Sequence, residues 1–286
     1  FVILILSFVS WGCASRAVQS ERVLADSNRR FPPQYKVLGV PFIEQKTAQC
    51  GPATLAMALN FQERATTAEE LVPMVMTDPK RGTLRPDMIS AARRLGYMAV
   101  PITGMDLLFS EVSQGHPVIV FENLSVSWLP QWHYALVYGY NLETETVTLH
   151  SGPEEAKVWD LKKFERSWML GDYWGLVILK PGQIALSAGE LANLAAAAGL
   201  ERAGHLDRAH DSYQGILTAW PQSLGARIGL ANVAFAKNNY PAARSHLRTA
   251  LKHHPDSTAA LHNLKVVEQA LQKTQASLDD NYEPHQ

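Results

Sequence analysis

Cysteine is scarce in this sequence, with only Cys13 and Cys50 among 286 residues. If Cys13 carries a lipid, Cys50 has no partner, and no internal disulfide can form even in an oxidising compartment. An excess of charge of one sign is also missing, because 26 basic residues stand against 27 acidic ones and no basic run occurs. A nucleic-acid partner is therefore not expected, since such binding depends on clustered Lys and Arg.

A metal-ligand set is missing as well. Four histidines lie in the helical C-terminal part of the chain, but two of them are adjacent and so point to different faces. No Cys or carboxylate completes a set with them. We interpret them as solvated residues near helix ends, and we expect no metal or other cofactor. The four are His246, His253, His254 and His262.

An apolar run occupies residues 1–11 and ends at Gly12-Cys13. The run is too short to span a bilayer and is typical of a secretory signal. Gly12-Cys13 resembles a bacterial lipoprotein cleavage site, which makes Cys13 the expected lipidated residue. An ordinary cleaved signal and an uncleaved anchor are the alternatives. We expect an exported protein of the cell envelope, an outer-membrane lipoprotein facing the periplasm, with residues 1–13 as signal or anchor and 14–35 as a polar tether.

The most informative stretch runs from Gln45 through Cys50-Gly51-Pro52-Ala53 into an apolar helix. Pro52 suits a first helical turn, because its missing N–H has no intrahelical partner there. Cys50 is therefore expected at a helix N-terminus, where the dipole favours a thiolate. A buried structural cysteine is the alternative, since free Cys is often buried.

A thiolate nucleophile needs a base that is close in space. His133 opens an apolar strand pattern, His133-Tyr-Ala-Leu-Val-Tyr-Gly-Tyr140. Together, the CGPA motif and this strand resemble the bacteriocin-processing (double-glycine leader) peptidases and their relatives over roughly residues 36–180. The resemblance implies a papain-like fold, Cys50 as nucleophile, His133 as base and Gln45 as oxyanion-hole donor.

Two features depart from that family's pattern. Gln45 stands five positions before Cys50, where the family usually has six. The family's third catalytic residue is an Asp at the end of the strand after the histidine strand. This sequence has no carboxylate there, so the third member is open among four candidates, namely His150, Ser151, Asn141 and Asp160.

Helical patterns come first in residues 36–181 and strand patterns follow, which is an α+β order. Residues 123–132 form a loop with two tryptophans just before His133, either core packing or a wall of a substrate cleft. His116 is interpreted as structural. The expected elements are a strand at 37–43, a helix capped by Thr66 and Glu69, helices at 86–95, 104–114 and 161–168, and strands at 97–102, 116–121, 132–140, 144–150, 157–159 and 173–179.

Beyond residue 181 strands disappear and a repeat of 34 residues begins. Pro221 and Pro255 share this offset, as do Ala209 and Ala243. The spacing resembles tetratricopeptide repeats; two helical hairpins of coincidental spacing are the alternative. We expect an all-α domain at 187–273, with repeats at 190–223 and 224–257, a cap helix at 258–273, and a disordered tail at 274–286.

These patterns predict an α+β papain-like cysteine peptidase domain followed by an all-α tetratricopeptide-type domain. The expected activity is peptide-bond hydrolysis by Cys50 and His133. A peptide or protein is then the substrate, the repeats bind a protein partner, and the lipid anchor binds the membrane. Two alternatives differ in class. In one the domain is a degenerate peptidase that binds peptides without cutting them. In the other the repeats are a scaffold whose protein partner matters more than any chemistry.

Overall fold

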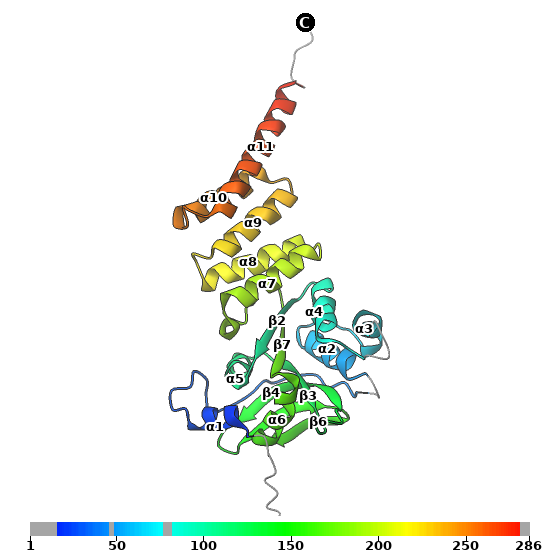
Figure 1. Cartoon of the computed structure of the whole chain (residues 1–286). Coiled ribbons are helices and arrows are strands. Elements are labelled where there is room, and N and C mark those ends of the chain that lie inside the picture. Colours follow the sequence, from blue (N-terminus) through cyan, green and yellow to red (C-terminus); the bar gives the residue numbers. More distant parts are fainter. Residues whose placement is uncertain (1–15, 46–48, 77–81, 281–286) are drawn as a thin grey trace, which may run out of the picture.

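Two differently built parts make up the molecule, an α/β part and a stack of helices on top of it (Figure 1). The computed structural model describes residues 16–45, 49–76 and 82–280, the last four by their backbone alone. No helix in these ranges is both long enough and apolar enough to cross a membrane.

The α/β part is organised around a seven-stranded sheet in which every pairing is antiparallel. Six strands follow the order β2-β7-β3-β4-β5-β6, and β1 pairs with the far end of β4. β4 is the long central strand that holds β1, β3 and β5. The strands are β1 Gln34–Lys36, β2 Met98–Thr103, β3 Val118–Asn123, β4 Trp132–Asn141, β5 Thr146–Ser151, β6 Glu154–Asp160 and β7 Trp174–Leu179.

Both faces of the sheet are covered by helices, as the alternation along its strands requires. On β4, Tyr134 and Leu136 pack in the cluster formed with α2, α3 and α4, whereas Ala135 and Val137 pack in the cluster formed with α5 and α6. This architecture confirms the expected α+β class. The helices are α2 Cys50–Phe61, α3 Ala68–Val75, α4 Arg85–Arg94, α5 Met105–Ser113 and α6 Leu161–Trp168.

The segment expected to be a tether contains a helix instead, α1 Val18–Ala25. Val23 is buried in the core, and the buried carboxylate of Glu165 accepts hydrogen bonds from the backbone N–H groups of Gln19 (2.9 Å) and Ser20 (2.6 Å). Because these N–H groups lie at a helix N-terminus, a carboxylate from a distant helix satisfies them. No local sequence period signals such a contact.

Two local expectations were also wrong in detail. The strand expected at 37–43 is β1, three residues earlier, and residues 37–45 follow it without regular structure. The capping box lies one residue later than expected, with Thr67 and Glu70 exchanging both hydrogen bonds. Thr66 instead donates its hydroxyl to Glu70 at 2.7 Å.

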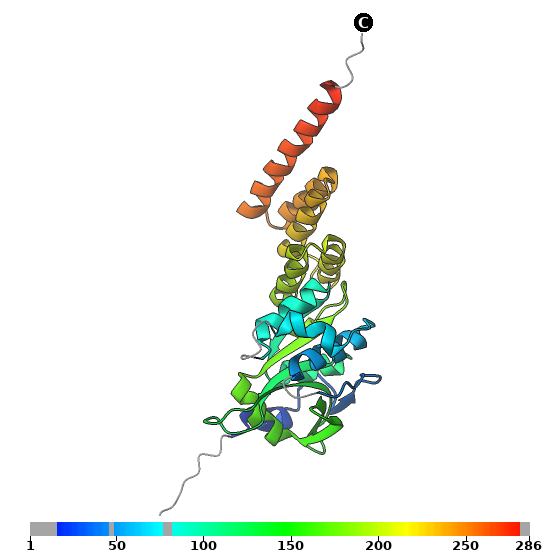
Figure 2. The same cartoon turned by 90° about the vertical axis from the view of Figure 1, so that its right-hand side faces the viewer.

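The helical part forms two antiparallel helix pairs and a long final helix, stacked away from the sheet (Figure 2). Ala209 and Ala243, which share the repeat offset, are both fully buried. The last helix continues to Asp280, so the tail is not disordered from residue 274; residues 281–286 lie outside the described part. The helices are α7 Gly189–Arg202, α8 Leu206–Ala219, α9 Leu224–Ala236, α10 Tyr240–His253 and α11 Thr258–Asp280.

The first helix pair packs directly against the α/β part. Arg208 donates to the carbonyl of Gly96 at 3.0 Å, and the ring of His205 lies 2.8 Å from the carbonyl of Arg94. Leu200 of α7 belongs to the same buried cluster as the strand β2. The carbonyl of Arg94, the last residue of α4, is thus satisfied by the repeats, whereas the carbonyls of Ala92 and Arg93 accept the backbone N–H groups of Tyr97 and Gly96.

Candidate active site

Cys50 is the first residue of α2, as the sequence predicted, and its side chain is half-buried. Backbone groups of Tyr134, Gly51 and Cys50 itself are within hydrogen-bonding reach of the sulfur. Gly51 has no room for a side chain, because a Cβ there would lie 2.4 Å from the hydroxyl of Thr83. The helix therefore meets its neighbours closely at the cysteine, and the sulfur lies against the start of β4.

His133 is the second residue of β4 and the direct neighbour of Tyr134. Its ring atom Nε2 lies 3.0 Å from the hydroxyl oxygen of Ser151 on β5. The α2–β4 interface thus brings Cys50 beside the backbone position next to His133, and β5 supplies the residue that orients the ring. Ser151 is the last residue of β5, the position at which the sequence resemblance predicts an Asp.

The other three candidates for the third residue are engaged elsewhere. His150 lies 3.3 Å from the carbonyl of Val40 and packs against the ring of Tyr138. Asn141 sits at the opposite end of β4, where its amide donates to Gln34. Asp160 accepts the N–H of Lys163 and begins α6. Of the four, only Ser151 is hydrogen-bonded to His133 in the part of the chain that the structure describes.

The electrostatics of the pair differ from the sequence-based expectation. Burial raises the pKa of the Cys50 thiol, and the nearby backbone groups reverse only part of this rise. Burial, and then the charge of Lys157, lowers the pKa of His133 to about 4. The resting pair is therefore a neutral thiol and a neutral imidazole near pH 7, whereas the helix N-terminus alone predicts a thiolate.

Gln45 lies beside the site with its side-chain amide fully engaged. Nε2 donates to the hydroxyl of Thr54 (2.9 Å) and to the carbonyl of Tyr134 (3.2 Å), and Oε1 accepts the N–H of Gly152 at 3.1 Å. Gln45 therefore ties α2, β4 and the β5–β6 turn together. A bond to an oxyanion requires Nε2 to exchange one of these acceptors, so the oxyanion role stays a prediction.

Sequence reasoning missed Thr54 and the carbonyl of Tyr134, which link α2 to β4. The buried hydroxyl of Thr54 donates its one proton to the carbonyl of Cys50 at 2.6 Å and lies 3.2 Å from the carbonyl of Tyr134 as a second acceptor. The available signal was its position four residues after Cys50, on the same helix face. The predicted lipidation site, Cys13, lies outside the described residues.

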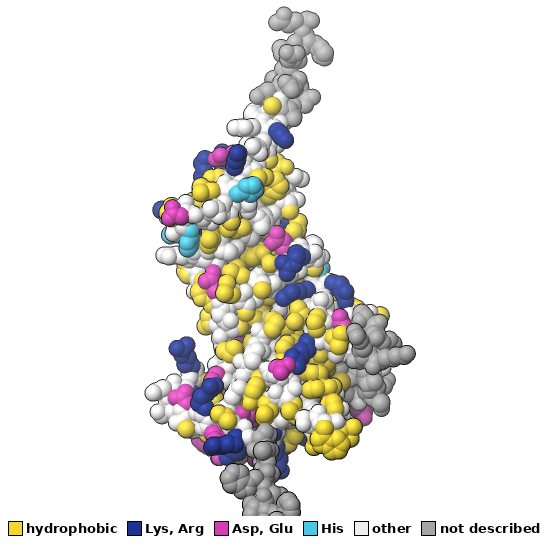
Figure 3. Space-filling model, in the orientation of Figure 1, with side chains coloured by type: hydrophobic (Ala, Val, Ile, Leu, Met, Phe, Trp, Pro, Cys, Tyr) yellow, Lys and Arg dark blue, Asp and Glu magenta, His cyan; other side chains and the backbone are white. Residues whose placement is uncertain are grey.

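The loop between β3 and β4 leads directly into His133 and exposes apolar side chains. Trp128 is 81% exposed and Trp132 is 47% exposed, so simple core packing does not explain them. Trp132 stacks on Phe121 with ring centroids 5.0 Å apart. Hydrophobic side chains are dense on the visible face of the α/β part of the molecule (Figure 3). We name Leu124, Val126, Trp128, Leu129 and Trp132 the apolar loop.

The fold is an α+β domain joined to helical repeats. Family models identify both parts. Residues 37–173 match the Peptidase_C39 like family, and residues 200–266 match the tetratricopeptide repeat. Each part of the chain thus has its own match, the α/β part to Peptidase_C39-like sequences and the helical part to tetratricopeptide repeats.

Three solved structures resemble about half of this chain. A putative C39-like peptidase from Bacillus anthracis is 17% identical, covers 51% of this chain and 98% of its own, and has a TM-score of 0.45. A double glycine motif protease from an AMS/PCAT transporter, in complex with the leader peptide, is 19% identical, covers 50% of this chain and 93% of its own, and has a TM-score of 0.40. The peptidase domain of Streptococcus ComA is 24% identical, covers 51% of this chain and 98% of its own, and has a TM-score of 0.40. No curated protein matches the chain.

Proposed function

We propose that this protein is a cysteine peptidase, with Cys50 as nucleophile and His133 as general acid and base. The observation that carries the proposal is the 3.0 Å contact between His133 Nε2 and the hydroxyl of Ser151. The residue after His133 on β4, Tyr134, borders the Cys50 sulfur with its backbone. A nucleophile, a base and a group that orients the base are the parts that covalent catalysis requires.

In the proposed reaction the Cys50 sulfur attacks the peptide carbonyl while His133 takes the thiol proton. His133 then gives this proton to the leaving amine, and a thioester remains that water hydrolyses. The backbone N–H groups at the start of α2 are the oxyanion donors available without rearrangement. Each such donor contributes roughly 3–4 kcal/mol to lowering the barrier. Gln45 joins them if Nε2 leaves the Tyr134 carbonyl.

The apolar loop is proposed to hold the substrate, because it ends next to His133 and its side chains face solvent. Tryptophan offers a large contact area with few rotors to freeze. The expected substrate is therefore a peptide or protein segment with apolar residues near the scissile bond. Export coupled to processing, known for some peptidases of this kind, is not part of the proposal.

The deciding experiment is labelling of the wild-type protein with an epoxide or iodoacetamide probe, combined with hydrolysis of a broad peptide library. Cys50→Ala should abolish both labelling and hydrolysis, and His133→Ala should abolish hydrolysis and slow labelling. Ser257→Ala, a cap of α11 far from the site, is the matched control that should change neither. No turnover by the wild type on any peptide would overturn the proposal.

A second function, peptide binding without cleavage, has its own support. Ser151 replaces the expected carboxylate, the Cys50–His133 pair is neutral, and Gln45 is fully engaged. These features weaken chemistry without closing the site. Tight peptide binding that persists in Cys50→Ala, together with no cleavage by the wild type, would favour this function.

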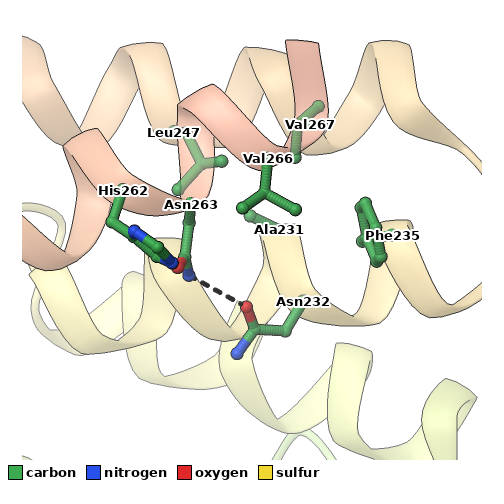
Figure 4. A pocket seen from close by; sticks show the side chains of 8 residues that line it. All are labelled: Ala231, Asn232, Phe235, Leu247, His262, Asn263, Val266 and Val267. Atoms are coloured by element: carbon green, nitrogen blue, oxygen red, sulfur yellow. Dashed lines mark hydrogen bonds between the residues drawn. The ribbon is translucent and has the colours of Figure 1, made fainter. Parts of the chain in front are cut away.

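The repeats are proposed to bind a protein partner. A groove of about 370 Å³ lies between α9 and α11, lined by Phe235 and Val266 on its apolar side and by Asn232, His262 and Asn263 on its polar side (Figure 4). Asn263 donates to Asn232 at 3.3 Å, which leaves amide groups available for a peptide backbone. Val266→Arg, compared with the exposed Leu191→Arg, should weaken binding of the partner in a pull-down from envelope extracts.

Anchoring to the outer membrane through lipidated Cys13 is part of the proposal. It rests on the apolar run before Gly12-Cys13. Cys13→Ser should move the protein from the membrane to the soluble exported fraction. A wild-type protein found wholly in the soluble fraction would contradict it.

A further inference from the structure

Four neighbouring strands carry polar side chains on one face of the sheet, near the end where Cys50 lies. Glu122 of β3 is directly opposite His133 of β4, and Ser151 of β5 contacts the His133 ring. Lys157 of β6 is opposite Leu149, which is itself opposite the buried Val137. Since opposed residues of antiparallel strands share a face, this polar row of Glu122, His133, Ser151 and Lys157 lies on the side that α6 covers.

Glu122 is the unexplained member of the row. Its side chain is fully buried, and Oε2 accepts a hydrogen bond from Ser167 of α6 at 3.0 Å. Oε1 has no hydrogen-bond partner among the described residues. A buried carboxylate with one oxygen unpaired is costly, so its retention calls for a reason. Directly opposed residues have Cβ atoms about 4.5–5.5 Å apart, so the side chains of Glu122 and His133 leave the sheet as neighbours, with no hydrogen bond between them among the described residues.

We propose that Glu122 is a positioning residue for His133, the carboxylate that compensates the imidazolium charge where Ser151 offers only a hydroxyl. The inference rests on the proposed peptidase function. During the reaction the thiol proton moves from Cys50 to His133 and on to the leaving amine. Glu122 stays ionised and makes or breaks no covalent bond, so its contribution is the charge alone.

The groups around Glu122 determine when it carries that charge. Burial raises its pKa to about 7, against the opposing effects of the Ser167 hydroxyl and the Lys157 ammonium. His133 faces it from β4 and Lys157 from β6, while Lys163 and Arg166 of α6 lie on the outer side near Asn123. Because Glu122 changes its charge near neutral pH, it makes the activity of the site depend on pH in this range.

The test compares Glu122→Gln with Glu111→Gln in the full-length protein. Glu111 is the matched control, a second fully buried glutamate that contacts His116 rather than the site. For the wild type, kcat/KM should rise with pH around a midpoint near 7. Glu122→Gln should lose this rise, and its rate at pH 8 should fall at least about tenfold, less than the roughly 10⁴-fold cost at a directly bonded aspartate.

Glu111→Gln should keep the wild-type pH profile whatever it does to stability. An unchanged pH profile and rate in Glu122→Gln would overturn the inference. A change in rate without a change in profile would also overturn it, because that result indicates a structural role only.

A second measurement separates this inference from the peptidase proposal and needs no variant at position 122 that folds. Imidazole NMR shifts of His133, assigned with His133→Ala, should show an inflection near pH 7 in the wild type as Glu122 ionises. This inflection in a protein that cleaves nothing would support the charge coupling and reject the peptidase. Cleavage with no inflection would reject the coupling and keep the peptidase.

Discussion

Two half-buried imidazoles in the α/β part have opposite kinds of partner. His116, just before β3, has its Nδ1 2.7 Å from the carboxylate of the fully buried Glu111. His133, in the candidate site, has the hydroxyl of Ser151 at 3.0 Å. A carboxylate stabilises a charged imidazole, whereas a hydroxyl orients the ring without compensating a charge. The carboxylate of Glu111 thus contacts His116, the structural histidine, whereas His133, the candidate base, contacts only a hydroxyl and stays neutral.

The largest expected effect comes from removing each imidazole in turn. His133→Ala should lower kcat by at least roughly 10³-fold, because the general base is lost, with little change in stability. His116→Ala should leave kcat within about twofold but cost about 1–3 kcal/mol of stability, because Glu111 loses a hydrogen-bond partner. Library hydrolysis and urea unfolding measure the two effects. Equal loss of activity in both variants would contradict the different roles.

Giving His133 the kind of partner that His116 has should raise activity. Ser151→Asp places a carboxylate next to Nε2 and raises the pKa of His133. We expect kcat to rise by roughly 10²-fold, part of the 10⁴-fold effect of a triad aspartate. Ser151→Asn, which orients the ring without charge, is the control and should stay near the wild type. A Ser151→Asp protein that remains inactive would favour the binding function.

Stability as a function of pH should distinguish the charge states at the site. Glu122 has a raised pKa of about 7 in the folded state, so its contribution to stability falls as pH rises from about 4.5 to 7. His133 has a lowered pKa of about 4, so its contribution rises with pH from about 4 to 6.5. Each change is about 3 kcal/mol, and over the shared window they offset each other.

Glu122→Gln removes the contribution to stability that falls as pH rises and leaves the contribution of His133 in place. The free energy of unfolding of this variant should therefore rise between about pH 4 and 6.5, whereas these two groups leave the wild type nearly flat there. Urea unfolding at half-unit steps of pH measures the difference between the curves. Parallel curves for the two proteins would show that Glu122 does not titrate in the folded state as its burial requires.

A smaller effect is expected for the thiol. Because burial raises the pKa of Cys50, the rate of alkylation by iodoacetamide should have its midpoint above ~8.5, the value of a free thiol. Ser151→Asp should lower this midpoint, since a charged His133 favours the thiolate. A wild-type midpoint below ~8.5 would restore the thiolate that the helix N-terminus alone predicts.

The smallest effect is expected at the apolar loop. Trp128→Ser should raise KM several-fold with kcat unchanged, because the side chain contributes binding area and no chemistry. Leu191→Ser, equally exposed on α7, is the matched control and should leave KM unchanged. Both variants should keep the free energy of unfolding within about 0.5 kcal/mol of the wild type, as exposed substitutions do.

The α+β class, most of the helices and strands, and the repeats could be predicted from the order of the residues alone. The apolar run after Cys50, the exact helix 161–168 and the 34-residue offset are local or periodic signals, and each follows from side-chain spacing alone. The motifs that carry the resemblance to the double-glycine leader peptidases singled out Cys50, His133 and Ser151 as members of a candidate set. They did not choose Ser151 over His150, Asn141 and Asp160, because neighbours on a strand point to opposite faces and the register of β4 with β5 determines which one meets His133.

The charge states and the long-range contacts follow from the three-dimensional packing, and no local pattern predicted them. The helix N-terminus predicts an acidic thiol, but the burial of Cys50 beneath neighbouring segments reverses the direction of its pKa shift. Helix α1 owes its place to Glu165, 145 residues away from Ser20. Glu122 looks like one polar residue at the end of an apolar strand until β4 places His133 opposite it. Desolvation and cross-strand pairing depend on what lies around a residue in space, and this information is absent from its neighbours in the chain.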